Sequence, residues 1–182
     1  RSWNEDNDDD MYYNQDRIAD ITIKERNFDP NRMHAAIVNT FGEVPTVSYS
    51  KKSKDEYVAT IVFGEGDYTF DYSGTDLANH VAKVNFAGGN EKMFFVDKTA
   101  PVITDNFATL VKADTHNNFN VEKTVSLRIE EHHFSPELVN LTVLRKNAGV
   151  THSAEGFVNA TAEVLAGEVW NSNGDVHSME FT

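Results

Sequence analysis

The stretch GEGDYTFDYSGTDLAN, residues 64–79, decides how this chain is expected to fold. Three aromatic residues, Tyr68, Phe70 and Tyr72, alternate in it with smaller polar residues. Successive side chains of a β-strand point to opposite faces, so this alternation predicts a strand with one face buried in a core. The glycine-rich acidic turn at residues 64–67 marks where that strand begins.

Similar short apolar runs, separated by turn signals, surround this stretch. They predict about seven short strands in the first hundred residues, a spacing typical of an all-β fold rather than of alternating strands and helices. The expected strands are residues 11–13, 17–26, 33–40, 57–63, 68–73, 81–86 and 92–96, and Val47 and Tyr49 lead into a basic loop at 51–54. The one helical turn expected is at residues 76–82.

The chain repeats part of its sequence at an offset of 106 residues. Residues 17–30 align with residues 123–136, so that Phe28 matches Phe134 and Pro30 matches Pro136. A recurrence of this length predicts an array of like modules. Further along, we match residues 176–182 with residues 57–63.

The second copy differs from the first in two ways. A longer insert at residues 147–175 contains Trp170, and the second copy as given holds no counterpart of the Gly66–Phe70 run. A proline-bearing stretch at 97–101 predicts a boundary. We therefore expect a linker and first edge strand at 1–16, a first module at 17–97, and a second module at 98–182. The second module is either incomplete or carries the long insert, and the chain is interpreted as a piece of a longer protein.

Composition narrows the functional classes. The 182 residues include 29 acidic against 16 basic residues, a formal net charge of −13, and no cysteine. Such a surface repels phosphate backbones and anionic membranes, so neither nucleic acid nor a membrane is an expected partner. It favours cations, Ca²⁺ among them. Without cysteine, the core must rely on packing alone.

Three motifs together resemble the tandem immunoglobulin-like repeats of large surface proteins in Gram-positive gut bacteria. They are ITIKERNFDP at 21–30, GDYTFDYSGTDLAN at 66–79 and FFVDKTAPVI at 94–103, the last containing a linker typical of such arrays. Tyr68 also resembles the tyrosine corner of immunoglobulin-like domains, with Phe70 at the core position that carries the second cysteine in antibodies.

This resemblance implies an all-β fold of tandem immunoglobulin-like β-sandwiches, export from the cell, and a stalk or adhesive role. The expected location is extracellular, on a bacterial cell surface or secreted. The expected function is a non-catalytic segment that takes part in adhesion or binds host macromolecules. Two alternatives stay open: an immunoglobulin-binding, superantigen-like module, and an accessory or carbohydrate-binding module of a secreted glycan-degrading enzyme. An exposed row of aromatic rings would favour the sugar-binding alternative.

No enzyme activity is expected from the sequence. Nucleophilic catalysis needs a serine or cysteine beside a base, and the chain has neither cysteine nor a G-x-S-x-G motif. The seven histidines show no metal-binding spacing. His132 and His133 are adjacent, so on a strand they would face opposite sides.

Calcium is the only cofactor for which the sequence offers candidate ligands. Asp76, Asn79 and Asp97 could supply oxygens where loops and linkers meet, and the acidic run 6–10 offers others. The competing interpretations are that Asp76 caps a short turn that Asn79 ends, and that the acidic run is a solvated linker.

Partner binding has three candidate residues, Trp170, Tyr12 and Tyr13, because Trp and Tyr are enriched at binding hot spots. Trp170 could fill a pocket on a partner, or it could be a core residue of the second module, where it would correspond to Tyr49. The tyrosines could contact a neighbouring module of the same chain. The expected partners are a host protein, immunoglobulin included, and neighbouring immunoglobulin-like modules.

Overall fold

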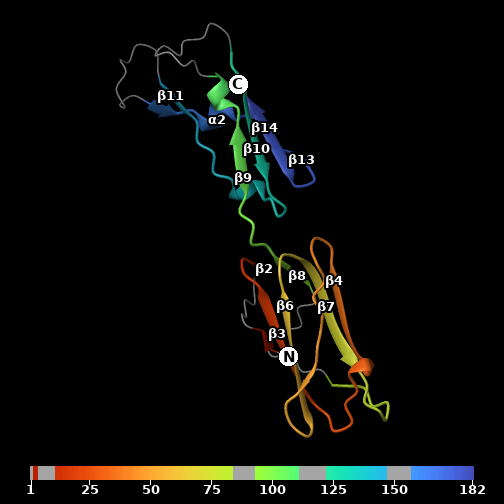
Figure 1. Cartoon of the computed structure of the whole chain (residues 1–182). Coiled ribbons are helices and arrows are strands. Elements are labelled where there is room, and N and C mark those ends of the chain that lie inside the picture. Colours follow the sequence, from red (N-terminus) through yellow and green to blue (C-terminus); the bar gives the residue numbers. More distant parts are fainter. Residues whose placement is uncertain (1, 4–10, 84–92, 111–121, 147–156) are drawn as a thin grey trace. The chain divides into compact units, whose positions relative to one another are not determined.

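A computed structural model describes residues 2–3, 11–83, 93–110, 122–146 and 157–182 (Figure 1). The chain divides into two compact units, Arg1–Thr99 and Ala100–Thr182, and each is described by itself. The acidic run 6–10 and the end of the strand expected at 81–86 lie outside the described residues.

The first unit consists of two four-stranded sheets. The first sheet has the order β1 (Ser2–Trp3), β3 (Arg17–Lys24), β6 (Glu56–Phe63) and β5 (Ser50–Lys51). The second has the order β2 (Tyr12–Tyr13), β8 (Met93–Val96), β7 (Gly66–Gly74) and β4 (Met33–Asn39). Neighbouring strands are antiparallel except for β2 and β8.

The core lies between these two sheets. Tyr68, Phe70 and Tyr72 of β7 are 2%, 1% and 7% exposed, which confirms the alternation predicted for this strand. Phe63 of β6 reaches them from the other sheet, with its ring centroid 5.1 Å from Tyr68 and 5.3 Å from Phe70. It lies 5.1 Å from Phe94 of β8 as well. Aromatic rings thus hold together two sheets that have no disulfide.

Polar contacts fix the start of β7. The Tyr68 hydroxyl donates to the carbonyl oxygens of Glu43 at 3.3 Å and Glu65 at 3.5 Å. The Asn39 side-chain oxygen accepts from the backbone N–H of Asp67 at 3.0 Å. Gly66 has φ +149°, and a Cβ there would collide with the Asn39 side chain, so this turn requires glycine.

Two local predictions in the first unit were wrong. Val81 makes a single bridge to Thr75, and Ala82 and Lys83 lie outside any strand. Residues 76–80 form a tight turn rather than a helix, because the Asp76 side chain bonds to nearby backbone N–H groups.

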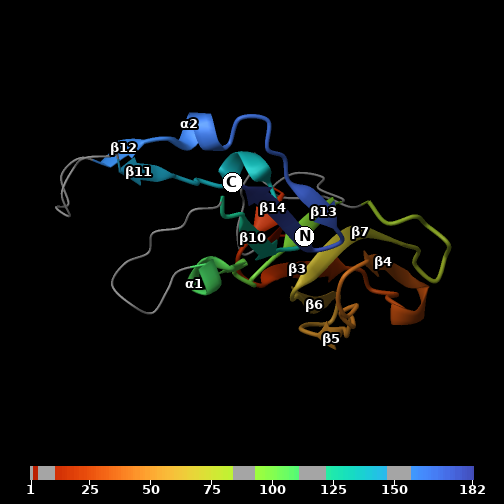
Figure 2. The ribbon, with the colours of Figure 1, turned by 90° about the horizontal axis from the view of Figure 1, so that it is seen from above.

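The second unit contains one four-stranded sheet and one strand pair among its described residues. The sheet has the order β13 (Asn171–Asn173), β14 (Val176–Phe181), β10 (Val125–Glu130) and β9 (Val102–Asp105). Figure 2 shows the pair, β11 (Leu144–Lys146) beside β12 (Phe157–Asn159). Two short helices, α1 (Phe107–Leu110) and α2 (Thr161–Val164), complete it.

The sequence repeat is also a structural repeat. Strands β1-β3-β6-β5 of the first unit and β9-β10-β14-β13 of the second have the same order and are all antiparallel. Short 3-10 turns at Pro30–Arg32 (η1) and Pro136–Leu138 (η2) also correspond at the offset of 106. The first sheet of the first unit is therefore built a second time along the chain.

The strand register corrects one detail of the alignment. Ile23 pairs with Tyr57, and its counterpart Ile129 pairs with His177, so His177 rather than Val176 corresponds to Tyr57. Matching residues 176–182 with 57–63 was therefore wrong by one residue. A slip of one residue exchanges the buried and exposed faces of a strand.

Equivalent ring clusters occupy the two units. Phe28 lies edge-on to Tyr49 at 5.3 Å, and Phe134 lies edge-on to Trp170 at 5.2 Å. The second neighbour of Phe134 is His177, with ring centroids 4.0 Å apart. In the first unit, Tyr57 takes that place 4.3 Å from Phe28. The structure thus confirms that Phe28 and Phe134 have equivalent surroundings.

None of the helices in the described part of the chain has the length and apolar character that crossing a membrane requires. Taken together, the secondary structure is predominantly β-sheet in both units.

Candidate functional site

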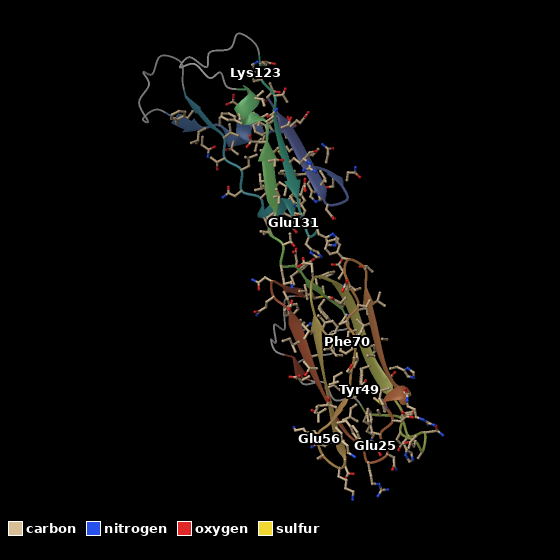
Figure 3. The ribbon with its side chains drawn as sticks, viewed as in Figure 1. Glu25, Tyr49, Glu56, Phe70, Lys123 and Glu131 are labelled. Carbon is tan, nitrogen blue, oxygen red and sulfur yellow. The ribbon has the colours of Figure 1, made fainter. Side chains whose placement is uncertain are left out.

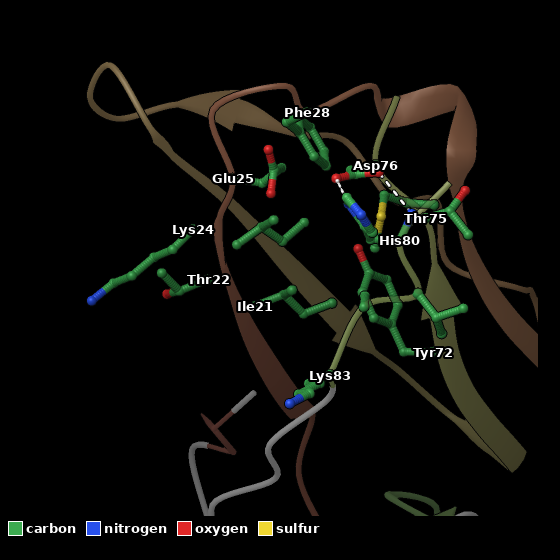
Figure 4. Close-up of a pocket in the computed structure, with 14 residues that line it drawn as sticks. Ile21, Thr22, Lys24, Glu25, Phe28, Tyr72, Thr75, Asp76, His80 and Lys83 are labelled. Atoms are coloured by element: carbon green, nitrogen blue, oxygen red, sulfur yellow. Dashed lines mark hydrogen bonds and ion pairs between the residues drawn. The ribbon is translucent and has the colours of Figure 1, made fainter. Parts of the chain in front are cut away.

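A pocket lies between the two sheets of the first unit. Residues of β3 and of the end of β7 line it, together with residues of the loops that follow these strands. The cavity has a volume of about 440 Å³ (Figure 4). That volume lies within the range of small-ligand pockets.

The pocket has an apolar floor and a charged mouth. Buried Ile21 and Tyr72 form the floor together with half-buried Ile23, Phe28 and Met33. The mouth carries ionisable side chains of both signs: Lys24, Glu25, Asp76, His80 and Lys83. An apolar group could enter between the sheets while a polar or charged part stayed at the mouth.

An ion pair borders the mouth. The His80 Nδ1 atom lies 2.9 Å from Asp76 Oδ2, and the His80 side chain is 81% exposed. The hydrogen bond with His80 lowers the pKa of the Asp76 carboxyl. The same bond raises the pKa of the His80 imidazole. Asp76 Oδ1 accepts from the backbone N–H groups of Ala78 and His80, each at 2.8 Å, so the pair holds this loop in its turn.

Two further contacts brace the pocket. Arg32 donates to the Asp76 carbonyl oxygen at 3.0 Å and to Asn79 Oδ1 at 2.8 Å, which ties the loop after β3 to the loop after β7. Behind the floor, the Tyr72 and Tyr49 hydroxyls lie 2.5 Å apart. Burial raises the pKa of both phenols, so they stay neutral.

Three loops meet at the end of the unit where the pocket lies. They are residues 24–33, 50–56 and 74–83, and together they are called the loop end. The register places them there, because Lys24 pairs with Glu56 and Met33 with Gly74. Figure 3 shows Glu25 and Glu56 at this same end, with Phe70 in the middle of the unit. The Glu25 N–H also donates to the Asp55 carbonyl oxygen at 2.9 Å.

The loop end reverses the charge of the chain as a whole. Its three segments hold seven of the 16 basic residues but only five of the 29 acidic ones. The basic residues are Lys24, Arg26, Arg32, Lys51, Lys52, Lys54 and Lys83, and all except half-buried Arg32 are exposed. A locally basic surface on an acidic protein attracts negatively charged partners. The net charge of the chain did not predict it, although the basic loop at 51–54 was visible in the sequence.

The predicted calcium ligands do not form one site. Asp76 and Asn79 lie at the loop end, whereas Asp97 follows Val96, which pairs with Gly66 at the other end of β7. At about 3.3 Å per residue, this nine-residue strand separates them by over 20 Å. Asp97 Oδ1 accepts from the Thr99 N–H at 3.1 Å. The Asp76 carboxylate already bonds to the His80 ring and to the N–H groups of Ala78 and His80, and Asn79 Oδ1 accepts from Arg32. The capping interpretation fits better, since Asn79 has φ 66°.

The three candidate partner-binding residues have different surroundings. Trp170 is half-buried against Phe134, which fits its interpretation as a core residue. Tyr13 is only 4% exposed and packs in the core, with the Arg17 guanidinium carbon 4.2 Å from its ring centroid. The choice of Tyr13 as a partner-binding residue was therefore wrong. Tyr12 is 49% exposed and stacks on Phe95 at 4.7 Å.

The surface tyrosine does not belong to a row of rings. The exposed aromatic residues described in the first unit are Tyr12 and Phe41. Tyr12 lies on β2 and Phe41 follows β4, and these strands are opposite edges of one sheet. At about 4.8 Å between neighbouring strands, they are roughly 14 Å apart or more, too far to form one stacking platform.

Compared with protein-family models, curated proteins and solved structures, the chain matches none of them.

Proposed function

We infer that the first unit is an immunoglobulin-like β-sandwich, and we propose that the chain is a non-catalytic repeat segment of a bacterial cell-surface protein that binds host macromolecules. Immunoglobulin-like domains place strands A, B, E and D in one sheet and C, F and G in the other. The sheet orders β1-β3-β6-β5 and β4-β7-β8 agree with that arrangement. The Tyr68 hydroxyl also bonds to the backbone three residues upstream, as in a tyrosine corner.

The observation that carries the proposed function is the recurrence of one strand order and one ring cluster in both units. A recurring sheet and ring cluster support a tandem array of modules. Such arrays extend a protein from a surface and present loops to partners, which agrees with the family resemblance of the sequence motifs.

The described residues also favour binding over catalysis. His80 is a candidate base at the pocket mouth, and the hydrogen bond of its ring goes to Asp76 Oδ2. Among the residues that the structure describes, no serine or threonine hydroxyl bonds to that ring. A histidine base activates a nucleophile only when the nucleophile lies within hydrogen-bond reach. The sugar-binding alternative has less support, because the exposed rings of the first unit are far apart.

Binding to purified host proteins tests the proposed function. The 182-residue chain is immobilised and exposed separately to serum immunoglobulin, mucin and matrix glycoproteins, and to a glycan array. We expect saturable binding to at least one of the proteins and none to isolated glycans. Retention of immunoglobulin alone would select the immunoglobulin-binding alternative, whereas retention of glycans alone would select the accessory module of a glycan-degrading enzyme. No retention of any probe would contradict the proposal.

A further inference from the structure

We propose that the loop end of the first unit is a docking surface for an acidic peptide segment of a partner protein, with one large apolar side chain of that segment filling the pocket between the sheets. This inference names the surface and the partner chemistry for the binding that the proposed function assumes. It depends on two independent features of the loop end, its charge and its cavity.

Charge defines the class of partner. The loop end carries two more basic than acidic residues, whereas the rest of the chain carries nine basic and 24 acidic residues. Glu56 and Lys52 of the loop end pair with each other at 3.1 Å, and Asp76 pairs with His80. Lys24, Lys54 and Lys83 are exposed. An acidic segment would be attracted here and repelled by the remainder of the surface.

The cavity defines what the segment must contain. Its floor consists of Ile21, Ile23, Met33 and Tyr72 from the two sheets and of Phe28 from the loop after β3. Interfaces gain most of their affinity from a few aromatic or large aliphatic side chains that enter such pockets, with charged groups around them. A volume of about 440 Å³ accommodates an aromatic side chain.

The surface is organised before binding. The Glu25–Asp55 backbone bond joins the first and second loops, and the Arg32 bonds to Asp76 and Asn79 join the first and third. A surface held in place by such contacts loses less conformational entropy when a partner binds. The mouth of the pocket is therefore available without rearrangement of the three loops.

A designed peptide tests the proposal with the whole chain. The probe is a seven-residue peptide with tryptophan in the centre and aspartate or glutamate elsewhere, labelled for fluorescence anisotropy. We expect saturable binding that weakens about tenfold or more when alanine replaces the tryptophan, and similarly when asparagine and glutamine replace the acidic residues. Raising the salt concentration from about 0.05 M to about 0.3 M should also weaken it, because exposed charges are screened.

Two pairs of matched variants locate the binding surface. The double variant Lys52→Gln/Lys54→Gln should weaken peptide binding at least tenfold. The control double variant Lys98→Gln/Lys123→Gln removes the same charge elsewhere and should change the binding less than twofold. Ala82 lines the pocket and Ala78 does not, although both are exposed in one loop. Ala82→Trp should therefore block binding, and Ala78→Trp should preserve it.

The outcomes separate this inference from the proposed function. If a host protein binds the chain, and Lys52→Gln with Lys54→Gln and Ala82→Trp leave that binding unchanged, the docking surface is contradicted while the proposed function stands. No binding of the peptide, or equal binding of the acidic and neutral peptides, would also overturn the inference. Self-association of the chain that Ala82→Trp abolishes would identify a second copy as the occupant and contradict the acidic partner.

Discussion

At the scale of single residues, aromatic side chains join the two sheets of the first unit. Phe70 is 1% exposed and packs 5.3 Å from Phe63 of the facing sheet. Tyr68 adds a buried ring whose hydroxyl fixes the start of the same strand. Each ring therefore contributes both apolar burial and contact between the sheets.

Replacing Phe70 by alanine should destabilise the first unit by roughly 3–5 kcal/mol, the usual cost of removing a buried ring. Urea unfolding of the chain, monitored by hydrogen exchange of the β7 amides, measures this loss of stability. Thr69→Ala is the control on the same strand, because Thr69 is exposed, and its effect should stay near 0.5 kcal/mol. Equal effects of the two substitutions would contradict the buried position of Phe70.

The Asp76–His80 pair predicts that the stability of the first unit depends on pH. The raised pKa of His80 means that its contribution to stability is present below its ordinary value of 6.5 and is lost as the pH rises through the raised pKa. The lowered pKa of Asp76 means that its contribution is present above 3.8 and is lost as the pH falls through the lowered pKa. The pair is thus fully formed only between these two transitions.

NMR titration of the His80 ring checks whether the Asp76–His80 pair forms. We expect Asp76→Asn to move the pKa of His80 down towards 6.5, since the hydrogen bond and the negative charge are both weakened. Asp71→Asn is the matched control, because Asp71 is also exposed on the first unit but is not a partner of His80. A pKa of His80 that is the same in the wild type and in Asp76→Asn would show that the pair does not form.

At the scale of elements, the loops of the first unit are joined by specific side chains. Arg32 follows β3 in sequence and bonds to two oxygens in the loop after β7. At the opposite end, Asn39 accepts from the N–H groups of Phe41, Gly42 and Asp67, each at 3.0 Å. These contacts explain why stretches without regular pairing have defined shapes.

Arg32→Ala should loosen the loop at 74–83 without unfolding the sheets. Bonds from a charged donor are worth more than 1 kcal/mol when buried, and partial exposure of Arg32 reduces this to about 1 kcal/mol. Hydrogen exchange at the Asn79 and Ala82 amides should then accelerate about fivefold, with the β7 amides near Phe70 unchanged. Unchanged exchange in the loop would show that Arg32 does not hold it.

The alternation of side chains and the residues typical of turns predicted the strands that have strong side-chain patterns. They did not predict strands whose pairing depends on residues far away in the sequence. Tyr68, Phe70 and Tyr72 could be placed because each alternate side chain meets the core. Val81 could not, because its apolar character suggested a strand although 76% of it is exposed. The pocket was also beyond prediction, since its lining comes from two segments that are far apart in the sequence, residues 21–33 and 72–83.

At the scale of the whole molecule, repetition and charge distribution matter most. The repeat was predictable, because Phe28 and Phe134 keep their spacing to the proline that begins each 3-10 turn. The loop end was not, because its basic residues come from three segments that only the fold brings together. A net charge of −13 conceals a locally basic surface of this kind.

Removal of calcium should not alter stability. A chelator should leave the melting temperature of the chain within about 1 °C of its value in added Ca²⁺. Asp97 is distant from Asp76, the Asp76 carboxylate bonds to His80 and Ala78, and Asn79 Oδ1 accepts from Arg32. Differential scanning calorimetry in both conditions measures this. A rise of several degrees with Ca²⁺ would show a site among other residues, since ligand at 100 times its Kd adds about 2.7 kcal/mol.

The recurrence of one sheet and one ring cluster in both units is measured most directly by nuclear Overhauser effects between aromatic protons. We predict that Phe28 contacts Tyr49 and Tyr57, and that Phe134 contacts Trp170 and His177, at short distances in both cases. Contacts of Phe28 without the matching contacts of Phe134 would show that the second unit is not a copy of the first sheet, and would contradict the proposal that this chain is a segment of a repeat array.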